Sequence, residues 1–352
     1  MVDDLVLNVP LLRRRVPNLT AAAKTAGLRP ATVSNLCSGK TPVGRAEVRT
    51  LVTLATLAGC SLDDLIIRGS GSTMIETGIK VLDVFAPLVR GGISGFKAEH
   101  GQGMVVLVAE LLQRTKKRGY VTVFWKPLDR VIWSEDLEEL SDHSFTTKTE
   151  IIHFITNNNE DKDIVLCADK GIVFSGELTE LKENVEGLGQ RPITYLLIDM
   201  STDQNEPADH AFGPLDTLFH FDLDLANRHF YPALDPLFST STISEGAMLE
   251  ANHQIIQQRA RKLLRRFREL RAVVSRNGVH TLKEGDKLTF NRGEKLEAYL
   301  TQPFYVAEEL TKQKGEWVPL HEALEDIRKI MDGVYDQKVA KEFMFTGSVL
   351  HV

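Results

Sequence analysis

Short apolar runs recur through the middle of the chain, and polar or helical stretches separate them. Residues 93–97, 121–125, 164–168 and 193–198 are such runs, and each has the length of a strand. The apolar stretch 105–112, which follows the first run, has the character of a helix. This alternation of strands and helices predicts a central α/β domain with a mostly parallel sheet between helices.

The pattern becomes helical from residue 249 onward. Apolar side chains recur at helical spacing between residues 256 and 270, and basic side chains occupy the other faces. Such a helix suits contact with DNA phosphates, an acidic partner or a membrane surface, but we favour a simple solvated face. The region 283–336 continues the pattern and predicts a C-terminal helical domain. The basic residues are Arg259, Arg261, Lys262, Arg265, Arg266, Arg268 and Arg271.

Three helices are predicted near the N-terminus, which makes this domain all-α. The first covers residues 5–15. Asn18 caps a second helix over 19–26, because its side chain can accept a hydrogen bond from a free N–H of the first turn. Gly27 then turns the chain, and a third helix covers 31–38.

Residues 61–64 start a closing helix, and residues 68–72 form a flexible linker. The segment 18–66, NLTAAAKTAGLRPATVSNLCSGKTPVGRAEVRTLVTLATLAGCSLDDLI, resembles helix-turn-helix domains of the Cro/repressor type. ATVSNLCSGK, residues 31–40, is similar to the recognition helix of the lactose-repressor type. The resemblance implies double-stranded DNA as a partner.

The third helix has an apolar and a polar face. Val33, Leu36 and Cys37 form the inward face, so the short polar side chains point outward. Thr, Ser and Asn can reach base edges, whereas Arg and Lys suit the phosphate backbone. The alternative is a small protein-interaction module with ordinary polar caps. The predicted DNA-binding residues are Arg29, Thr32, Ser34, Asn35, Lys40 and Arg45.

The strand 93–97, the loop 98–103 and the following helix have the layout of a phosphate-binding loop. In the pattern GxxxxGK[ST], however, the lysine position is Met104 and the hydroxyl position is Val105. The strand–loop–helix layout is kept, whereas the side chains that hold phosphate and Mg²⁺ in such a loop are lost. The degenerate loop comprises Ala98, Gly101, Gly103, Met104 and Val105.

Four segments in one order resemble the β subunit of the rotary ATP synthases. They are ETGIKVLDVFAPLVRGG at 76–92, YPALDPLFSTS at 231–241, and the stretches 284–311 and 317–336. LANRHFYPALD, residues 225–235, is also similar to the export ATPases of that superfamily. The resemblance spans residues 74–350 and implies a RecA-like central domain. It does not extend to the N-terminus, where the β subunit carries a small β-barrel.

The resemblance also implies positions for nucleotide chemistry. Tyr231 and Phe304 match the two aromatic residues that sandwich adenine, although both can equally be core aromatics. Asp129-Arg130 aligns with the glutamate and arginine of the catalytic site, but aspartate is shorter, so we favour an ordinary surface carboxylate. Asp199 matches an acidic residue that helps hold Mg²⁺, and we favour a simple strand-end carboxylate because Val105 offers no hydroxyl.

Composition fits a soluble globular protein of two or three domains: 352 residues, 43% hydrophobic and 26% charged. Neither a membrane span nor a secretory signal is evident, so we expect a cytoplasmic protein. Cys37, Cys60 and Cys167 are scattered, which predicts reduced thiols rather than disulfides or a zinc site.

Charge is unevenly distributed. Residues 1–68 hold nine Lys and Arg against five Asp and Glu, a net charge of +4, whereas the remainder holds 33 against 43, a net charge of −10. A basic N-terminal segment on an acidic body is what a nucleic-acid-binding module joined to a non-binding domain would have.

Three domains are therefore expected: a helix-turn-helix domain at 1–69, an ATP synthase β-like domain with a degenerate phosphate loop at 70–248, and a helical domain at 249–352. The expected function is that of a DNA-binding transcriptional regulator without enzyme activity, whose ATPase-like domain senses a ligand or assembles the protein. Self-association as a dimer or ring is expected. No metal is expected, and the only cofactor considered is a weakly bound adenine nucleotide. The alternatives are a nucleotide hydrolase with an altered phosphate loop and a protein-interaction scaffold.

Overall fold

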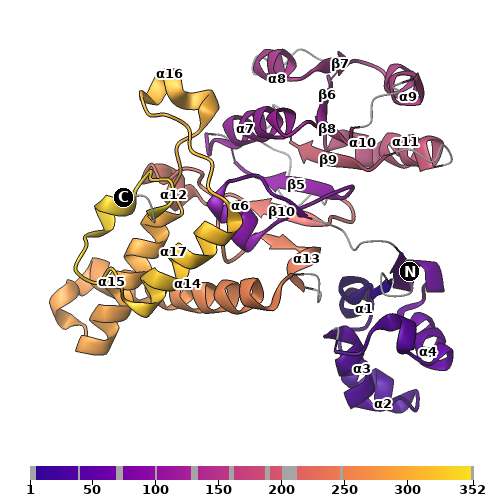
Figure 1. Ribbon diagram of the computed structural model, residues 1–352, viewed down its shortest axis with the longest axis horizontal. Coiled ribbons are helices and arrows are strands. Elements are labelled where there is room, and N and C mark those ends of the chain that lie inside the picture. Colours follow the sequence, from indigo (N-terminus) through magenta and orange to yellow (C-terminus); the bar gives the residue numbers. More distant parts are fainter. Residues whose placement is uncertain are drawn as a thin grey trace.

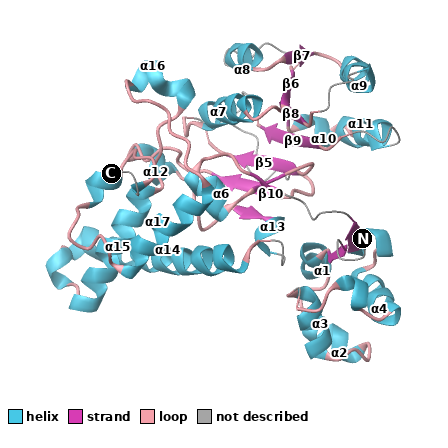
Figure 2. Cartoon of the chain, in the orientation of Figure 1, coloured by secondary structure: helices cyan, strands magenta, loops and turns pink. Residues whose placement is uncertain are grey.

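The computed structural model describes residues 5–38, 40–68, 74–99, 101–127, 134–157, 162–186, 191–199, 212–245 and 249–349. A seven-stranded sheet lies at the centre of the larger part, and the N-terminal helices form a unit of their own beside it (Figure 1). Helices cover the sheet and dominate the C-terminal part (Figure 2).

The sheet has the strand order β11-β10-β5-β9-β8-β6-β7. All neighbouring pairs are parallel except β10 and β11. The predicted, mostly parallel sheet is thus confirmed. The strands are β5 (Ile93–Lys97), β6 (Val121–Trp125), β7 (His143–Phe145), β8 (Ile164–Asp169), β9 (Ile193–Ile198), β10 (Thr217–His220) and β11 (Thr240–Ser241). A separate pair is formed by β3 (Met74–Ile75) and β4 (Leu88–Val89).

Two apolar cores lie on the two faces of the sheet, because successive strand residues point to opposite sides. Phe124 belongs to the core shared with the C-terminal helices, and its neighbour Val123 belongs to the core under α9 and α11. The helices of this part are α6 (Lys80–Phe85), α7 (Met104–Lys117), α8 (Ser134–Leu140), α9 (Lys148–Asn157), α10 (Gly171–Phe174), α11 (Glu177–Glu186), α12 (Leu223–Asn227) and α13 (Thr242–Glu245).

The predicted C-terminal helices are confirmed, and they share one continuous core with α6, α7 and the sheet. Leu296 of α15 and Ile327 of α17 are completely buried in that core. The elements are α14 (Ala251–Asn277), α15 (Glu284–Tyr299), α16 (Glu308–Thr311) and α17 (Leu320–Asp332), with 3₁₀ turns η2 (Val279–Thr281), η3 (Tyr305–Ala307) and η4 (Ala340–Phe343).

The N-terminal unit differs from the predicted all-α domain at both ends. Its first residues form β1 (Leu5–Leu7), which pairs with β2 (Ile66–Arg68), so the predicted helix over 5–15 is wrong in its first turn and the predicted linker begins within a strand. This pairing joins distant segments, which local periodicity does not reveal. The helical elements are α1 (Val9–Arg15), α2 (Leu19–Thr25), α3 (Pro30–Cys37), η1 (Val43–Arg45), α4 (Val48–Ala58) and α5 (Leu62–Leu65).

A buried carboxylate in the 76–92 segment gives stability a pH dependence. Asp83 accepts hydrogen bonds from Thr77 N (2.9 Å), Thr77 Oγ1 (2.7 Å) and Gly78 N (2.7 Å). Burial nevertheless raises the pKa of Asp83 from 3.8 to about 7. Burial also lowers the pKa of nearby Lys80 from 10.5 to about 7, so the pH dependence that Lys80 adds to stability lies above about pH 7.

Between pH 5 and 7 the folded state therefore holds a proton at Asp83 that the unfolded state has lost. The contribution of Asp83 to stability is full below about pH 4 and falls as pH rises to about 7. We expect Asp83→Asn to lose less stability than the wild type between pH 5 and pH 7 in urea unfolding. If the free energy of unfolding changed equally with pH in the two proteins, Asp83 would not be the group responsible.

Candidate functional site

The helices α2 and α3 meet at a tight turn. The side chain of Asn18 accepts a hydrogen bond from Ala21 N (3.2 Å) at the start of α2. Gly27 has φ +79°, a left-handed conformation that glycine adopts without strain. Leu28 N donates to Ala23 O (2.9 Å), and Pro30 opens α3. The predicted Asn18 cap and Gly27 turn are confirmed.

The outer face of α3 is polar, and its inner face is fixed in the core. Val33 and Leu36 are buried against a small core that includes completely buried Ala23 and Leu54. The predicted DNA-binding residues of this unit, Arg29, Thr32, Ser34, Asn35, Lys40 and Arg45, are all exposed.

A further basic residue was missed in the sequence. Arg49 is exposed in the first turn of α4, four residues after exposed Arg45. The Arg-x-x-x-Arg spacing around a helix start was the available signal. Together with Lys40 it extends the exposed basic surface from α3 to the start of α4.

The phosphate-loop region between β5 and α7 contains a hydrogen bond between a side chain and the backbone. The buried Gln102 accepts a hydrogen bond from Glu99 N (2.8 Å) through Oε1. Gly103 precedes α7 with φ +84°. Met104 and Val105 pack against the main core. These two positions therefore supply apolar contact where a phosphate loop has a cation and a hydroxyl.

Asp199 at the end of β9 has an internal cation as partner. Lys170, at the end of the neighbouring strand β8, donates to Asp199 Oδ2 at 2.5 Å, and the side chain of Lys170 is only 8% exposed. The ammonium group supplies the positive charge that a divalent cation would supply at this carboxylate. Asp129 and Arg130 lie outside the described residues.

The two predicted adenine-binding aromatics lie in different surroundings. Tyr231 is half-buried, and its ring covers Gly103 closely enough that an added Cβ there would lie 3.4 Å from Tyr231 Cε1. Phe304 is 6% exposed and belongs to the main core. Little of the Phe304 ring is thus offered to a ligand in this conformation.

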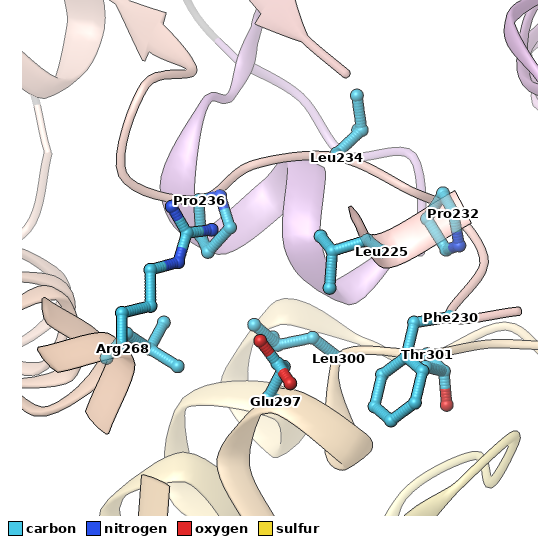
Figure 3. Close-up of a pocket in the computed structure, with 10 residues that line it drawn as sticks. Leu225, Phe230, Pro232, Leu234, Pro236, Arg268, Glu297, Leu300 and Thr301 are labelled. Atoms are coloured by element: carbon cyan, nitrogen blue, oxygen red, sulfur yellow. The ribbon is translucent and has the colours of Figure 1, made fainter. Parts of the chain in front are cut away.

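A small cavity lies beside the Tyr231 turn (Figure 3). Its volume is about 20 Å³, which is room for about one water molecule and not for a purine. Glu297 and Arg268 are the charged groups at its wall. The apolar lining consists of Leu225, Phe230, Pro232, Leu234, Pro236, Leu264 and Leu300, with Thr301 beside them.

Several arginines of α14 form hydrogen bonds with other elements of the molecule, whereas a simple solvated face would leave them in water. Arg268 donates to Asp235 (2.7 Å), Arg271 to Asp224 (2.6 Å) and Arg259 to Asp332 (2.6 Å). Arg261 donates to the carbonyl oxygens of Phe85 and Ser239, both at 2.9 Å. The basic stripe read from the sequence is therefore largely neutralised by neighbouring elements.

No cluster of three or more His, Cys, Asp or Glu side chains in the described part of the chain is placed to hold a metal ion. The three cysteines are free thiols. No described helix combines the length and apolar composition needed to cross a bilayer.

Comparison with known proteins supports the ATP-synthase-like part of the expectation. Residues 244–340 match the family model of the C-terminal domain of V and A type ATP synthase. The structure of the ATP synthase subunit NeqB from Nanoarcheaum equitans is similar, with a TM-score of 0.55 and 16% sequence identity over 74% of this chain and 76% of that chain. At this level of identity, the structural similarity establishes only the fold of the matched part of the chain. The helix-turn-helix assignment of the N-terminal unit stays a prediction from its sequence.

Proposed function

We propose that this chain is a DNA-binding transcriptional regulator with a catalytically inactive, RecA-like ATPase body. The observation that carries the proposal is the polar outer face of α3, with Thr32, Ser34 and Asn35 exposed opposite buried Val33 and Leu36. Short polar side chains on a helix that follows a glycine turn suit the edges of bases in the major groove. The exposed arginines and lysine around it suit phosphates. We also propose a cytoplasmic location for the protein.

The body is proposed to sense a ligand or to assemble the protein rather than to hydrolyse nucleotides. Phosphoryl transfer needs positive charge at the phosphates and a bound Mg²⁺. Met104 and Val105 provide neither, and the carboxylate of Asp199 is already paired with the ammonium group of Lys170. A protein with a similar fold is named as a subunit of an ATP synthase, which supports a role of the body in assembly, and we propose that residues 74–352 self-associate. A dimer would present two recognition helices to one DNA site, and a ring is the alternative arrangement.

The test of DNA binding is to mix the purified full-length protein with genomic fragments, recover the bound fraction and sequence it. Enrichment of a short shared sequence supports the proposal. A variant with Arg29→Ala, Lys40→Ala and Arg45→Ala is the matched control, because these exposed side chains can be removed without disturbing the core. Equal recovery of all fragments by both proteins would refute a sequence-specific regulator and would favour the scaffold.

Residual nucleotide binding is the second function to test, because the similarity to an ATP synthase subunit favours it. With no cation at position 104, we expect affinity to depend on adenine and hardly on phosphate number. Calorimetry should give weak, Mg²⁺-independent binding that is similar for adenosine, AMP, ADP and ATP and is reduced by Tyr231→Ala.

Hydrolysis should stay at background in the same preparations. ATP binding that is much tighter than AMP binding and requires Mg²⁺ would contradict an inactive body. ATP turnover that is abolished by Asp199→Ala would also contradict an inactive body. In either case a nucleotide hydrolase would be the better assignment.

A further inference from the structure

Helix α1 is the part of the N-terminal unit that lies beside the body. Cα atoms of α1 and α13 approach within 8 Å of one another. Figure 1 shows α2 and α3 at the end of the unit that points away from α13. Five residues separate β2 from β3, so the chain between these strands spans at most about 20 Å. Since Met74 of β3 packs against the small core that contains Ile243 of α13, the chain itself keeps the unit close to α13.

One apolar side chain of α1 is buried outside the core of its own unit. Leu11 is 8% exposed, whereas that core takes Val9, Leu12 and Val16 from α1. Successive helix residues point about 100° apart, so Leu11 lies on a different side of α1 from Val9 and Leu12. The element of the body beside this helix is α13.

The N-terminal unit passes the direction of α1 on to α3. Arg15 Nη1 of α1 donates to Gly59 O at the end of α4, at 2.7 Å. Leu12 of α1 and Val33 of α3 belong to one buried core. Because these helices are packed together, a rotation of α1 rotates α3 with it.

On the other side, α13 is fixed to the sheet and to α14. Thr242 N donates to Asp216 O at 2.8 Å, and the side chain of Gln257 donates to Ser244 Oγ at 3.1 Å. Ile243, between these two residues of α13, is 2% exposed. The helix therefore gives α1 a surface that is fixed relative to the body.

We propose that α1 docks on α13 through Leu11. This α1–α13 joint fixes the direction in which α3 faces relative to the body. The inference concerns the regulation of the DNA site and rests on the proposed function. In an assembly of two or more bodies, the joint sets the separation of the α3 helices, and hence the spacing of the DNA half-sites that can be bound together. A ligand or contact that moves the β11–α13 edge of the sheet changes that spacing.

The joint is tested first without DNA, in the full-length chain. NMR relaxation of backbone amides gives separate tumbling times for the N-terminal unit and the body, and the two should agree in the wild type. Leu11→Gln should shorten the tumbling time of the unit at least about twofold, because 68 of 352 residues have about a fifth of the volume. Leu62→Gln is the matched control, since Leu62 is a leucine of the same unit that is 37% exposed, and it should leave tumbling unchanged.

A change on α13 keeps this test independent of the fold of the N-terminal unit. Thr242 is half-buried, and Thr242→Lys should shorten the tumbling time of the unit as Leu11→Gln does. Independent tumbling in the wild type would overturn the joint. Unchanged tumbling in both variants would overturn it as well.

DNA with two copies of the captured half-site tests the consequence for binding. The wild type should bind one separation at least about tenfold more tightly than one longer by half a DNA turn, because about five base pairs move the second site to the opposite side of the duplex. Leu11→Gln should bind both separations equally well and a single half-site like the wild type. Equal wild-type affinity for the two separations would overturn the inference. If the unit and the body tumble together but no DNA sequence is preferred, the proposed regulator fails and the joint is still supported.

Discussion

Arg114→Met is expected to lower the free energy of unfolding by about 3–5 kcal/mol, because it leaves a buried carboxylate without its charge partner. Glu110 is completely buried and Arg114 is 1% exposed, and Arg114 Nε donates to Glu110 Oε1 at 2.5 Å. The guanidinium group also donates to the carbonyl oxygens of Thr77 (3.1 Å), Gly78 (3.0 Å) and Glu316 (2.7 Å). One side chain on α7 therefore joins the 76–92 segment to the C-terminal part.

Urea unfolding followed by tryptophan fluorescence measures this effect, since the Trp317 ring lies 5.6 Å from the Arg114 guanidinium. Arg118→Met, one turn further along, is the matched control. Its side chain is 51% exposed and 3.8 Å from Glu76, so its loss should cost about 0–1 kcal/mol. The double change Glu110→Gln with Arg114→Met should be less destabilising than Arg114→Met alone, because no charge stays buried. Similar costs for Arg114→Met and Arg118→Met would refute the assignment.

Thr32→Ala combined with Asn35→Ala is expected to reduce affinity for the captured DNA sequence by about 1–3 kcal/mol per lost base contact. Both side chains are exposed on the same face of α3, three residues apart. Affinity for unrelated DNA should change little, because phosphate contacts remain. Gel shifts on specific and unrelated fragments at several salt concentrations measure both quantities.

Two controls define the origin of that effect. Arg29→Ala or Lys40→Ala should weaken binding to every sequence and flatten its salt dependence, as loss of a phosphate contact does. Thr56→Ala on α4, whose hydroxyl donates to Val52 O within its own helix, should leave DNA binding unchanged. Wild-type affinity in a folded Thr32→Ala, Asn35→Ala protein would mean that α3 does not read bases.

The local sequence pattern was sufficient to predict those elements whose ends are set by single residues. Asn18, Gly27 and Pro30 place α2 and α3 because capping, positive φ and fixed φ are properties of single residues. The runs at β6, β8 and β9 identified the strands of the sheet because burial selects apolar side chains. The absence of a cation and a hydroxyl after Gly103 was also plain, since those positions are fixed by the loop.

Tertiary structure decided which side chains meet. The pairing of β1 with β2, the ion pair of Lys170 with Asp199 and the arginine partners along α14 all join residues far apart in sequence. The sequence by itself determined the strands β5, β6, β8 and β9, the lost phosphate-loop chemistry and the outward face of α3. Only the folded chain decided that Phe304 is buried, that Lys170 occupies the strand-end carboxylate and that Leu310 projects to solvent. The physical reason is that spacing along the chain fixes the direction of a side chain, whereas its partners depend on how distant segments pack.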